Sequence, residues 1–137
     1  MKREKTVWLT EPDAERLVLM QKFVRSPLEG QHLLALERKI SRASICHPAK
    51  IPADLVTMNS QVLLRDAETG DSCVYTLVFP AVENARKNRI SILGSLGRAL
   101  LGARVGDAIA YLSSAGRQLQ TVEKVLYQPW AAGMVCG

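Results

Sequence analysis

The chain has 137 residues, of which 47% are hydrophobic, 23% charged and 5% aromatic. These values are typical of one globular domain with a small appendage and argue against a multidomain enzyme. No apolar run approaches the roughly 20 residues that span a bilayer, and the charged start Met1–Trp8 lacks the apolar stretch of a secretory signal. We therefore expect a cytoplasmic chain with no membrane partner.

The charge is unevenly distributed along the chain. Lys and Arg number 18 against 13 Asp and Glu, a net charge of +5. Residues 1–50 hold 10 basic and 6 acidic side chains, a net of +4, whereas residues 51–137 hold 8 and 7, a net of +1. This excess favours an acidic partner surface or nucleic acid, but it falls short of a dedicated DNA-binding stripe.

Two helices are predicted in the first third of the chain. Thr10 is suited to cap a helix over residues 11–25, while the Pro and Gly of residues 26–30 break the pattern before a second helix over residues 31–45. Each helix has an apolar seam: Leu17, Met20 and Val24 in the first, and Leu33, Leu36, Ile40 and Ala43 in the second. The pattern predicts a short antiparallel helical hairpin, a coiled coil whose tip projects from a globular body.

Residues 47–52 are interpreted as a linker, so that a segment of residues 1–50 precedes a domain of residues 51–137. After Val56 the apolar pattern alternates, which is typical of β-strands. The predicted strands cover residues 60–65, 72–79, 90–92, 108–112 and 117–127. The predicted fold is therefore α+β, with a helical hairpin followed by an antiparallel β body.

Two finer features are expected within this β body. Ser95 is placed to cap a two-turn helix that Gly102 ends. The apolar phase slips between Leu119 and Val122, which predicts a β-bulge there.

Chemistry-bearing patterns are scarce. The chain has no glycine-rich phosphate loop, no Gly-x-Ser-x-Gly and no His-Glu-x-x-His, so we expect no catalytic residue and no cofactor. An acidic loop at residues 66–71 is typical of a solvated turn. The cysteines are odd in number and widely spaced, which predicts neither a disulfide framework nor a metal site and leaves their role open: Cys46, Cys73 and Cys136.

The tip of the hairpin carries the charged residues Lys22, Arg25 and Glu29. A metal ion held by the tip alone would need at least two converging carboxylates, and Glu29 is the one available. We therefore expect no metal at the tip.

Residues 90–107 are similar to the C-terminal domain signature of the Gre transcript-cleavage factors of bacterial RNA polymerase. This resemblance implies an FKBP-like body, an antiparallel sheet wrapped on one short helix. A likeness over nearly the whole chain is carried by the runs at residues 13–17, 56–62, 99–102, 105–107 and 127–129. With the short hairpin, these runs resemble the regulator of nucleoside diphosphate kinase family, which implies binding to RNA polymerase near its secondary channel.

The resemblance also indicates which functions carry over. Gre factors place two acidic residues at the hairpin tip to help hold the catalytic magnesium, whereas this chain has Glu29 alone, so we expect no transcript-cleavage stimulation and expect competition with Gre-type factors. Where Gre factors have Ser-Ser-Pro against a coiled coil of the polymerase, this chain has Leu93-Gly94-Ser95. The implied polymerase-binding residues are Leu93, Gly94, Ser95, Leu96 and Arg98.

Two other hypotheses stay open. The family name suggests direct modulation of nucleoside diphosphate kinase or of nucleotide metabolism, although nucleotide pools also change indirectly through transcription. The implied fold is shared with peptidyl-prolyl isomerases, but the chain has few aromatic residues for a proline pocket, and a fold does not by itself carry activity.

Overall fold

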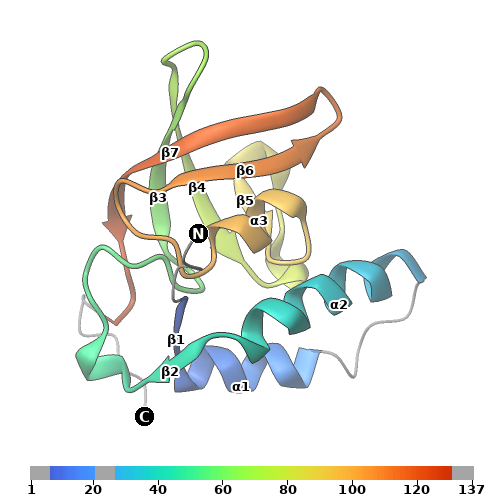
Figure 1. Ribbon diagram of the computed structural model, residues 1–137, viewed down its shortest axis with the longest axis vertical. Coiled ribbons are helices and arrows are strands. Elements are labelled where there is room, and N and C mark those ends of the chain that lie inside the picture. Colours follow the sequence, from blue (N-terminus) through green and yellow to red (C-terminus); the bar gives the residue numbers. More distant parts are fainter. Residues whose placement is uncertain (1–6, 21–26, 131–137) are drawn as a thin grey trace, which may run out of the picture.

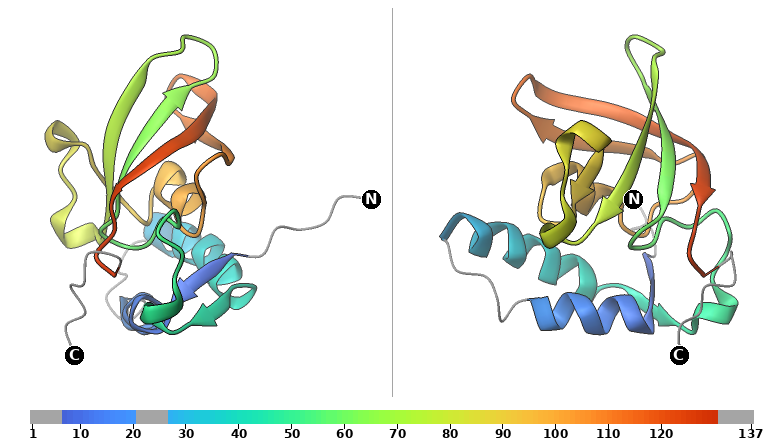
Figure 2. Two further views of the ribbon diagram at one scale, coloured as in Figure 1. Left: turned by 90° about the vertical axis from the view of Figure 1, so that its left-hand side faces the viewer. Right: turned by 180° about the vertical axis from the view of Figure 1, so that it is seen from behind.

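The computed structural model describes residues 7–20 and 27–130, without the side chains of residues 27–30. In this part of the chain the helices are α1 (Glu11–Met20), α2 (Pro27–Ser41) and α3 (Ser95–Leu100), with 3-10 turns η2 (Pro48–Lys50), η3 (Pro80–Val82) and η4 (Ala85–Lys87). The strands are β1 (Trp8–Thr10), β2 (Ser44–Cys46), β3 (Gln61–Asp66), β4 (Ser72–Val78), β5 (Arg89–Ser91), β6 (Ala108–Ser113) and β7 (Gly116–Tyr127). A curled sheet covers one side of α3, while α1 and α2 lie on the other side (Figures 1 and 2). The α+β class is confirmed.

Helix α1 begins where the sequence predicts. The backbone N–H of Asp13 donates to Thr10 Oγ1 over 3.2 Å, so Thr10 caps the first turn. The predicted continuation to residue 25 lies outside the described residues. None of the described helices is long and apolar enough to cross a membrane.

The predicted bounds of the second helix are wrong. Helix α2 starts at Pro27, because proline fits the first position of a helix, where its missing N–H has no intrahelical partner. The helix then continues through Gly30, whose cost of about 1 kcal/mol does not break it. It ends at Ser41 instead of residue 45, because residues 44–46 form β2, which pairs in parallel with β1.

Helix α2 packs against the body. Leu17 and Leu36 from the helices share one hydrophobic core with Val62, Leu77 and Leu100, and all five side chains are 0% exposed. Burial of each such side chain contributes roughly 1.5–3 kcal/mol. The helical pair is therefore held at Leu17 and Leu36 by the same core as the sheet. The predicted projecting tip stays a prediction, because residues 21–26 lie outside the described residues.

The larger sheet has the strand order β5-β4-β3-β7-β6. Its strands follow the predicted ranges closely, but β5 pairs in parallel with β4, so the sheet is not wholly antiparallel as predicted. The predicted bulge is misplaced, because the β6–β7 ladder is regular through Ala110↔Leu119. The irregularities lie further along β7, where the β3 partners jump from Val122 to Lys124. Leu119 keeps the regular phase and simply faces solvent.

Helix α3 packs closely on the end of β5. A Cβ on Gly97 would lie 2.0 Å from the Ser91 carbonyl oxygen, so only glycine fits at this contact. The predicted Ser95 cap is wrong, since Gly94 is the N-cap residue and no side chain caps the helix. The Ser95 hydroxyl oxygen instead accepts a hydrogen bond from the backbone N–H of Leu112, 2.9 Å away in β6. Gly102 ends the helical segment with φ +80°, as the sequence predicts.

Candidate functional site

A groove of about 320 Å³ opens between the β5 region, the start of α3 and the end of β6. The close contact of Gly97 with Ser91 sets α3 against β5, and the Ser95–Leu112 hydrogen bond ties α3 to β6. Its apolar lining includes Ile90, Leu96, Tyr111 and Leu112. Leu112 is 70% exposed, so an aliphatic side chain stands at the groove without an intramolecular cover. The arrangement suits the docking of a partner's side chains.

Three of the predicted polymerase-binding residues line this groove. Gly94 is exposed, while Ser95 and Leu96 are partly buried. A Cβ on Gly94 would meet the Ser91 carbonyl oxygen at an ordinary 3.4 Å, so larger residues fit there. These residues come from the loop and first turn that the sequence singles out.

The other two predicted residues make internal contacts. Leu93 is 9% exposed and belongs to the core. Arg98 Nη1 lies 2.9 Å from His32 Nδ1 and also donates to the Leu93 carbonyl oxygen. Because a guanidinium only donates, His32 Nδ1 is the acceptor in this pair. Partial burial lowers the pKa of Arg98, and the residue joins α2 to α3.

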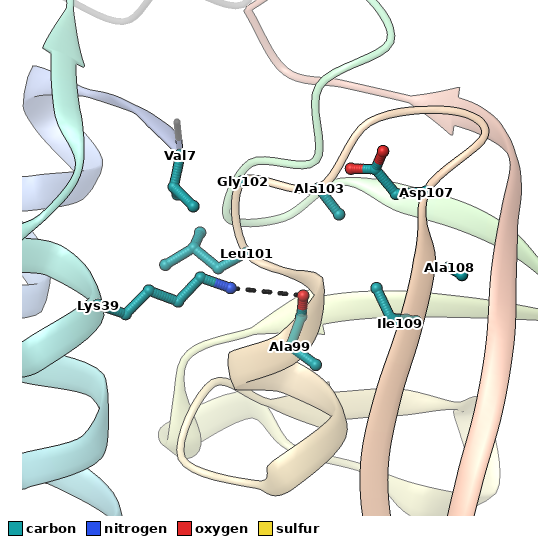
Figure 3. Close-up of a pocket in the computed structure, with 9 residues that line it drawn as sticks. All are labelled: Val7, Lys39, Ala99, Leu101, Gly102, Ala103, Asp107, Ala108 and Ile109. Atoms are coloured by element: carbon teal, nitrogen blue, oxygen red, sulfur yellow. Dashed lines mark hydrogen bonds between the residues drawn. The ribbon is translucent and has the colours of Figure 1, made fainter. Parts of the chain in front are cut away.

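Lys39 makes a second connection between α2 and α3. Its ammonium donates to the carbonyl oxygens of Arg98, at 2.5 Å, and Ala99, at 3.4 Å. Figure 3 shows this side chain at the edge of a small pocket of about 200 Å³, across from Asp107. Burial, followed by the nearby positive charge of Arg98, lowers the pKa of Lys39 to about 8. The contacts of Lys39 are those of a helix C-terminal cap supplied by another helix.

Asp13 is a buried acid that sequence reasoning treats only as part of a helix start. Its side chain is 1% exposed, and Oδ2 accepts the backbone N–H of Met58 over 3.0 Å. Burial raises its pKa to about 6, against the opposing effect of the Met58 hydrogen bond. The carboxyl group ties the start of α1 to the segment before β3. An acidic residue on the core side of the amphipathic pattern is the signal that could have found it.

The side chains of the residues predicted at the hairpin tip are not described by the structure. Lys22 and Arg25 lie outside the described residues, and Glu29 lies in α2, where its side chain is not described. Within the described ranges, no group of three His, Cys, Asp or Glu residues could hold a metal ion. Cys46 and Cys73 are free thiols, and Cys136 lies outside the described residues.

Comparison with known proteins relates this fold to transcription factors. The family "Transcription elongation factor, GreA/GreB, C-term" matches residues 51–127, which contain the groove. The regulator of nucleoside diphosphate kinase of Escherichia coli K12 is 37% identical over 133 residues, which cover 93% of this chain and 94% of that protein. The chain belongs to the regulator of nucleoside diphosphate kinase family, which is related to the Gre factors.

Gre factors are also similar to this regulator-family chain. The transcription elongation factor GreA of Rhodopseudomonas palustris TIE-1 is 33% identical over 90 residues, or 66% of this chain and 57% of that protein. A solved structure, the prokaryotic transcription elongation factor GreA/GreB from Nitrosomonas europaea, superimposes with a TM-score of 0.76 at 31% identity, covering 90% of this chain and 100% of that chain. The Gfh1 protein of Thermus thermophilus, at 23% identity and a TM-score of 0.51, shares the fold.

The regulator family match extends through the N-terminal helices, beyond the segment that the GreA/GreB C-terminal family covers. The groove lies inside that C-terminal segment, whereas Asp13, His32 and Lys39, which join α1 and α2 to the body, precede it. The relatives above are named as regulators and transcription factors, so this chain is a Gre-family regulator.

Proposed function

We propose that this chain is a non-catalytic transcription regulator that binds RNA polymerase near the secondary channel. Its FKBP-like body docks through the groove at Gly94, Ser95 and Leu96, and the basic helical hairpin, a short coiled coil, faces the channel mouth. Binding there competes with Gre-type factors and stimulates no transcript cleavage. The groove lies within the segment that resembles Gre factors, and this placement carries the proposal.

The groove has the form of a docking surface. It presents apolar side chains to solvent, among them Ile90, Leu96 and Leu112. Its walls are fixed by backbone contacts at Gly97 and by the Ser95 hydroxyl, so little ordering is needed on binding. A preformed site of this kind suits recognition of a folded partner surface. Arg98 and Lys39 hold α2 against α3, which forms one wall of the groove.

Binding to purified core RNA polymerase tests this function. Leu112→Ser removes the exposed aliphatic side chain at the groove, and we expect about tenfold weaker binding, in the range of an interface hot spot. Leu126→Ser is the matched control, because Leu126 is 47% exposed and lies near the far end of β7. Absence of binding by the unmodified protein, or equal affinity of the two variants, contradicts the proposal.

A second candidate is a direct effect on nucleoside diphosphate kinase, which the name of the Escherichia coli relative favours. Titration of the purified kinase with this protein in a calorimeter separates the two. Heat of binding at equimolar saturation supports direct contact, whereas its absence together with polymerase binding supports an indirect effect through transcription.

A further inference from the structure

The side-chain amine of Lys39 is held against the end of α3. Its Nζ donates to the carbonyl oxygens of Arg98, at 2.5 Å, and Ala99, at 3.4 Å. A lysine side chain has three N–H donors when it is protonated, and a neutral amine has two N–H groups and one lone pair. The two carbonyl oxygens therefore suffice for both N–H groups of a neutral Lys39. The lone pair of this neutral amine then points away from the two acceptors.

A pocket of about 200 Å³ opens beside this amine (Figure 3). Lys39 lines the pocket and is partly exposed, so a small molecule can reach it from solvent. Liquid water takes about 30 Å³ per molecule, so the pocket has room for a group of two or three carbon atoms. Most of the other lining residues are aliphatic, and they include Val7, Ala99, Leu101, Ala103 and Ile109.

The surroundings favour the neutral form of the Lys39 amine. Burial, followed by the positive charge of Arg98, lowers its pKa from the ordinary 10.5 to about 8. Asp107 lies across the pocket, where its Oδ2 accepts the backbone N–H of Arg104 over 2.8 Å. At pH 7 about one Lys39 amine in ten is then neutral, against about four in ten thousand for an unperturbed lysine. Lysine attacks carbonyl compounds as the neutral amine, so this fraction sets its reactivity.

We propose that Lys39 is a modification site, which accepts a small acyl group such as acetyl from an activated acyl donor. The lone pair of the neutral Nζ forms a bond to the carbonyl carbon of the donor. The C–O bond of an acyl phosphate, or the C–S bond of an acyl thioester, breaks, and the leaving group keeps the electron pair. The nitrogen releases one proton to water. The product is a neutral amide with its alkyl group beside the aliphatic lining of the pocket, and this proposal does not depend on the proposed function.

Carbon dioxide is another small electrophile, but its adduct suits the site less well. A carbamate carries a negative charge, which would lie beside the carbonyl oxygens of Arg98 and Ala99 and across the pocket from Asp107. An amide carries no charge and keeps one N–H for one of the two carbonyls. The other carbonyl loses its donor, so acylation weakens the connection between α2 and α3.

Mass spectrometry of the full chain tests the site directly. The protein is incubated at pH 7 with acetyl phosphate in one arm and acetyl coenzyme A in the other, and the acetylated fraction is measured at each lysine. Lys87 and Lys124 are exposed and serve as internal controls. We expect Lys39 to be acetylated about tenfold faster than either control, and the faster arm identifies the class of donor. Acetylation of Lys39 no faster than the controls in both arms overturns the proposal.

The pH dependence separates the reactivity of the amine from its exposure. The rate at Lys39 should rise with pH up to about 8 and then level off, because most of the amine is then neutral. The rate at an unperturbed lysine continues to rise about tenfold per pH unit beyond pH 9. A rate at Lys39 that rises in this way contradicts an activated amine.

Hydrogen exchange detects the consequence for α2. In the acetylated protein, the backbone amides of residues 36–40 should exchange about tenfold faster than in the untreated protein, while that of Leu64 in β3 stays unchanged. Lys39→Arg keeps a positive charge and is not acetylated, so the same treatment should leave its α2 amides unchanged. Equally fast exchange in treated Lys39→Arg would assign the effect to other lysines and contradict the weakened connection between α2 and α3.

Discussion

The Lys39 ammonium donates to the Arg98 carbonyl oxygen over a distance of 2.5 Å, which joins α2 to α3 through two residues that lie 59 positions apart in the chain. Carbonyls in the last turn of a helix lack intrahelical partners, and those of Arg98 and Ala99 end the short helix α3. A positive charge is also favourable at a helix C-terminus. Lys39 of α2 thus caps the C-terminal end of α3, and the groove beside α3 depends on α2 for its support.

Replacement of Lys39 tests this support. Lys39→Met leaves two carbonyls without a donor, and we expect a loss of about 1–2 kcal/mol in the free energy of unfolding at pH 7. The pKa of Lys39 falls to about 8 in the folded state, so between about pH 8 and 10.5 the unfolded chain binds more protons. Stability of the wild type should therefore rise with pH in this window relative to Lys39→Met. Urea titrations between about pH 8 and 10.5 measure the free energy of unfolding of the two proteins. If it changes with pH in the same way in both, the burial of the Lys39 charge is contradicted.

The contact between α3 and β5 predicts a sharp difference between two glycines. Gly97→Ala places a Cβ 2.0 Å from the Ser91 carbonyl oxygen, and overpacking of this kind costs about 1–3 kcal/mol or more. Gly94→Ala puts its Cβ at an ordinary 3.4 Å from the same oxygen, so it should cost at most about 1 kcal/mol, because alanine is a poorer N-cap than glycine. Chemical unfolding compares the free energies of unfolding of the two variants. Equal stability of the two variants would mean that α3 does not approach β5 so closely.

The buried carboxyl group of Asp13 should make the free energy of unfolding depend on pH at mildly acidic pH. Its pKa rises to about 6 in the folded state, so from about pH 4 to 6 the folded chain retains a proton that the unfolded chain has lost. The wild type should therefore lose stability relative to Asp13→Asn as pH rises through this range, by at most roughly 3 kcal/mol. Unfolding titrations at intervals of pH measure the difference, and a difference that grows in favour of the wild type has the wrong sign.

Addition of the protein to backtracked transcription complexes should not shorten the transcript. Glu29 is the one acidic residue of the predicted tip, and a single carboxylate does not replace the pair that Gre factors use to help hold the catalytic magnesium. A Gre factor serves as the positive control on the same complexes, and the present chain should slow its cleavage by competition. Cleavage stimulated by the chain alone, and lost in Glu29→Gln, would overturn this expectation.

Local signals in the sequence predicted the five strands of the larger sheet, the capped start of α1 and the loop that forms part of the groove, but not the short strands β1 and β2. Local patterns fail where a residue's place in the fold decides its role. Pro27, which by itself predicts a helix break, begins a helix, because the first helical position needs no N–H. Ser95, which by itself predicts a cap for α3, instead accepts a hydrogen bond from β6, a partner that only the packed structure supplies.

The sequence by itself determined the α+β class and the family, since these depend on periodicity, turn residues and short runs. The tertiary structure alone decided that Arg98 and Leu93 serve the interior, that Lys39 caps α3, and that Asp13 is buried against Met58. Such contacts join residues far apart in the chain, and their energies come from burial and from donors meeting distant carbonyls. Only the folded chain brings those groups together.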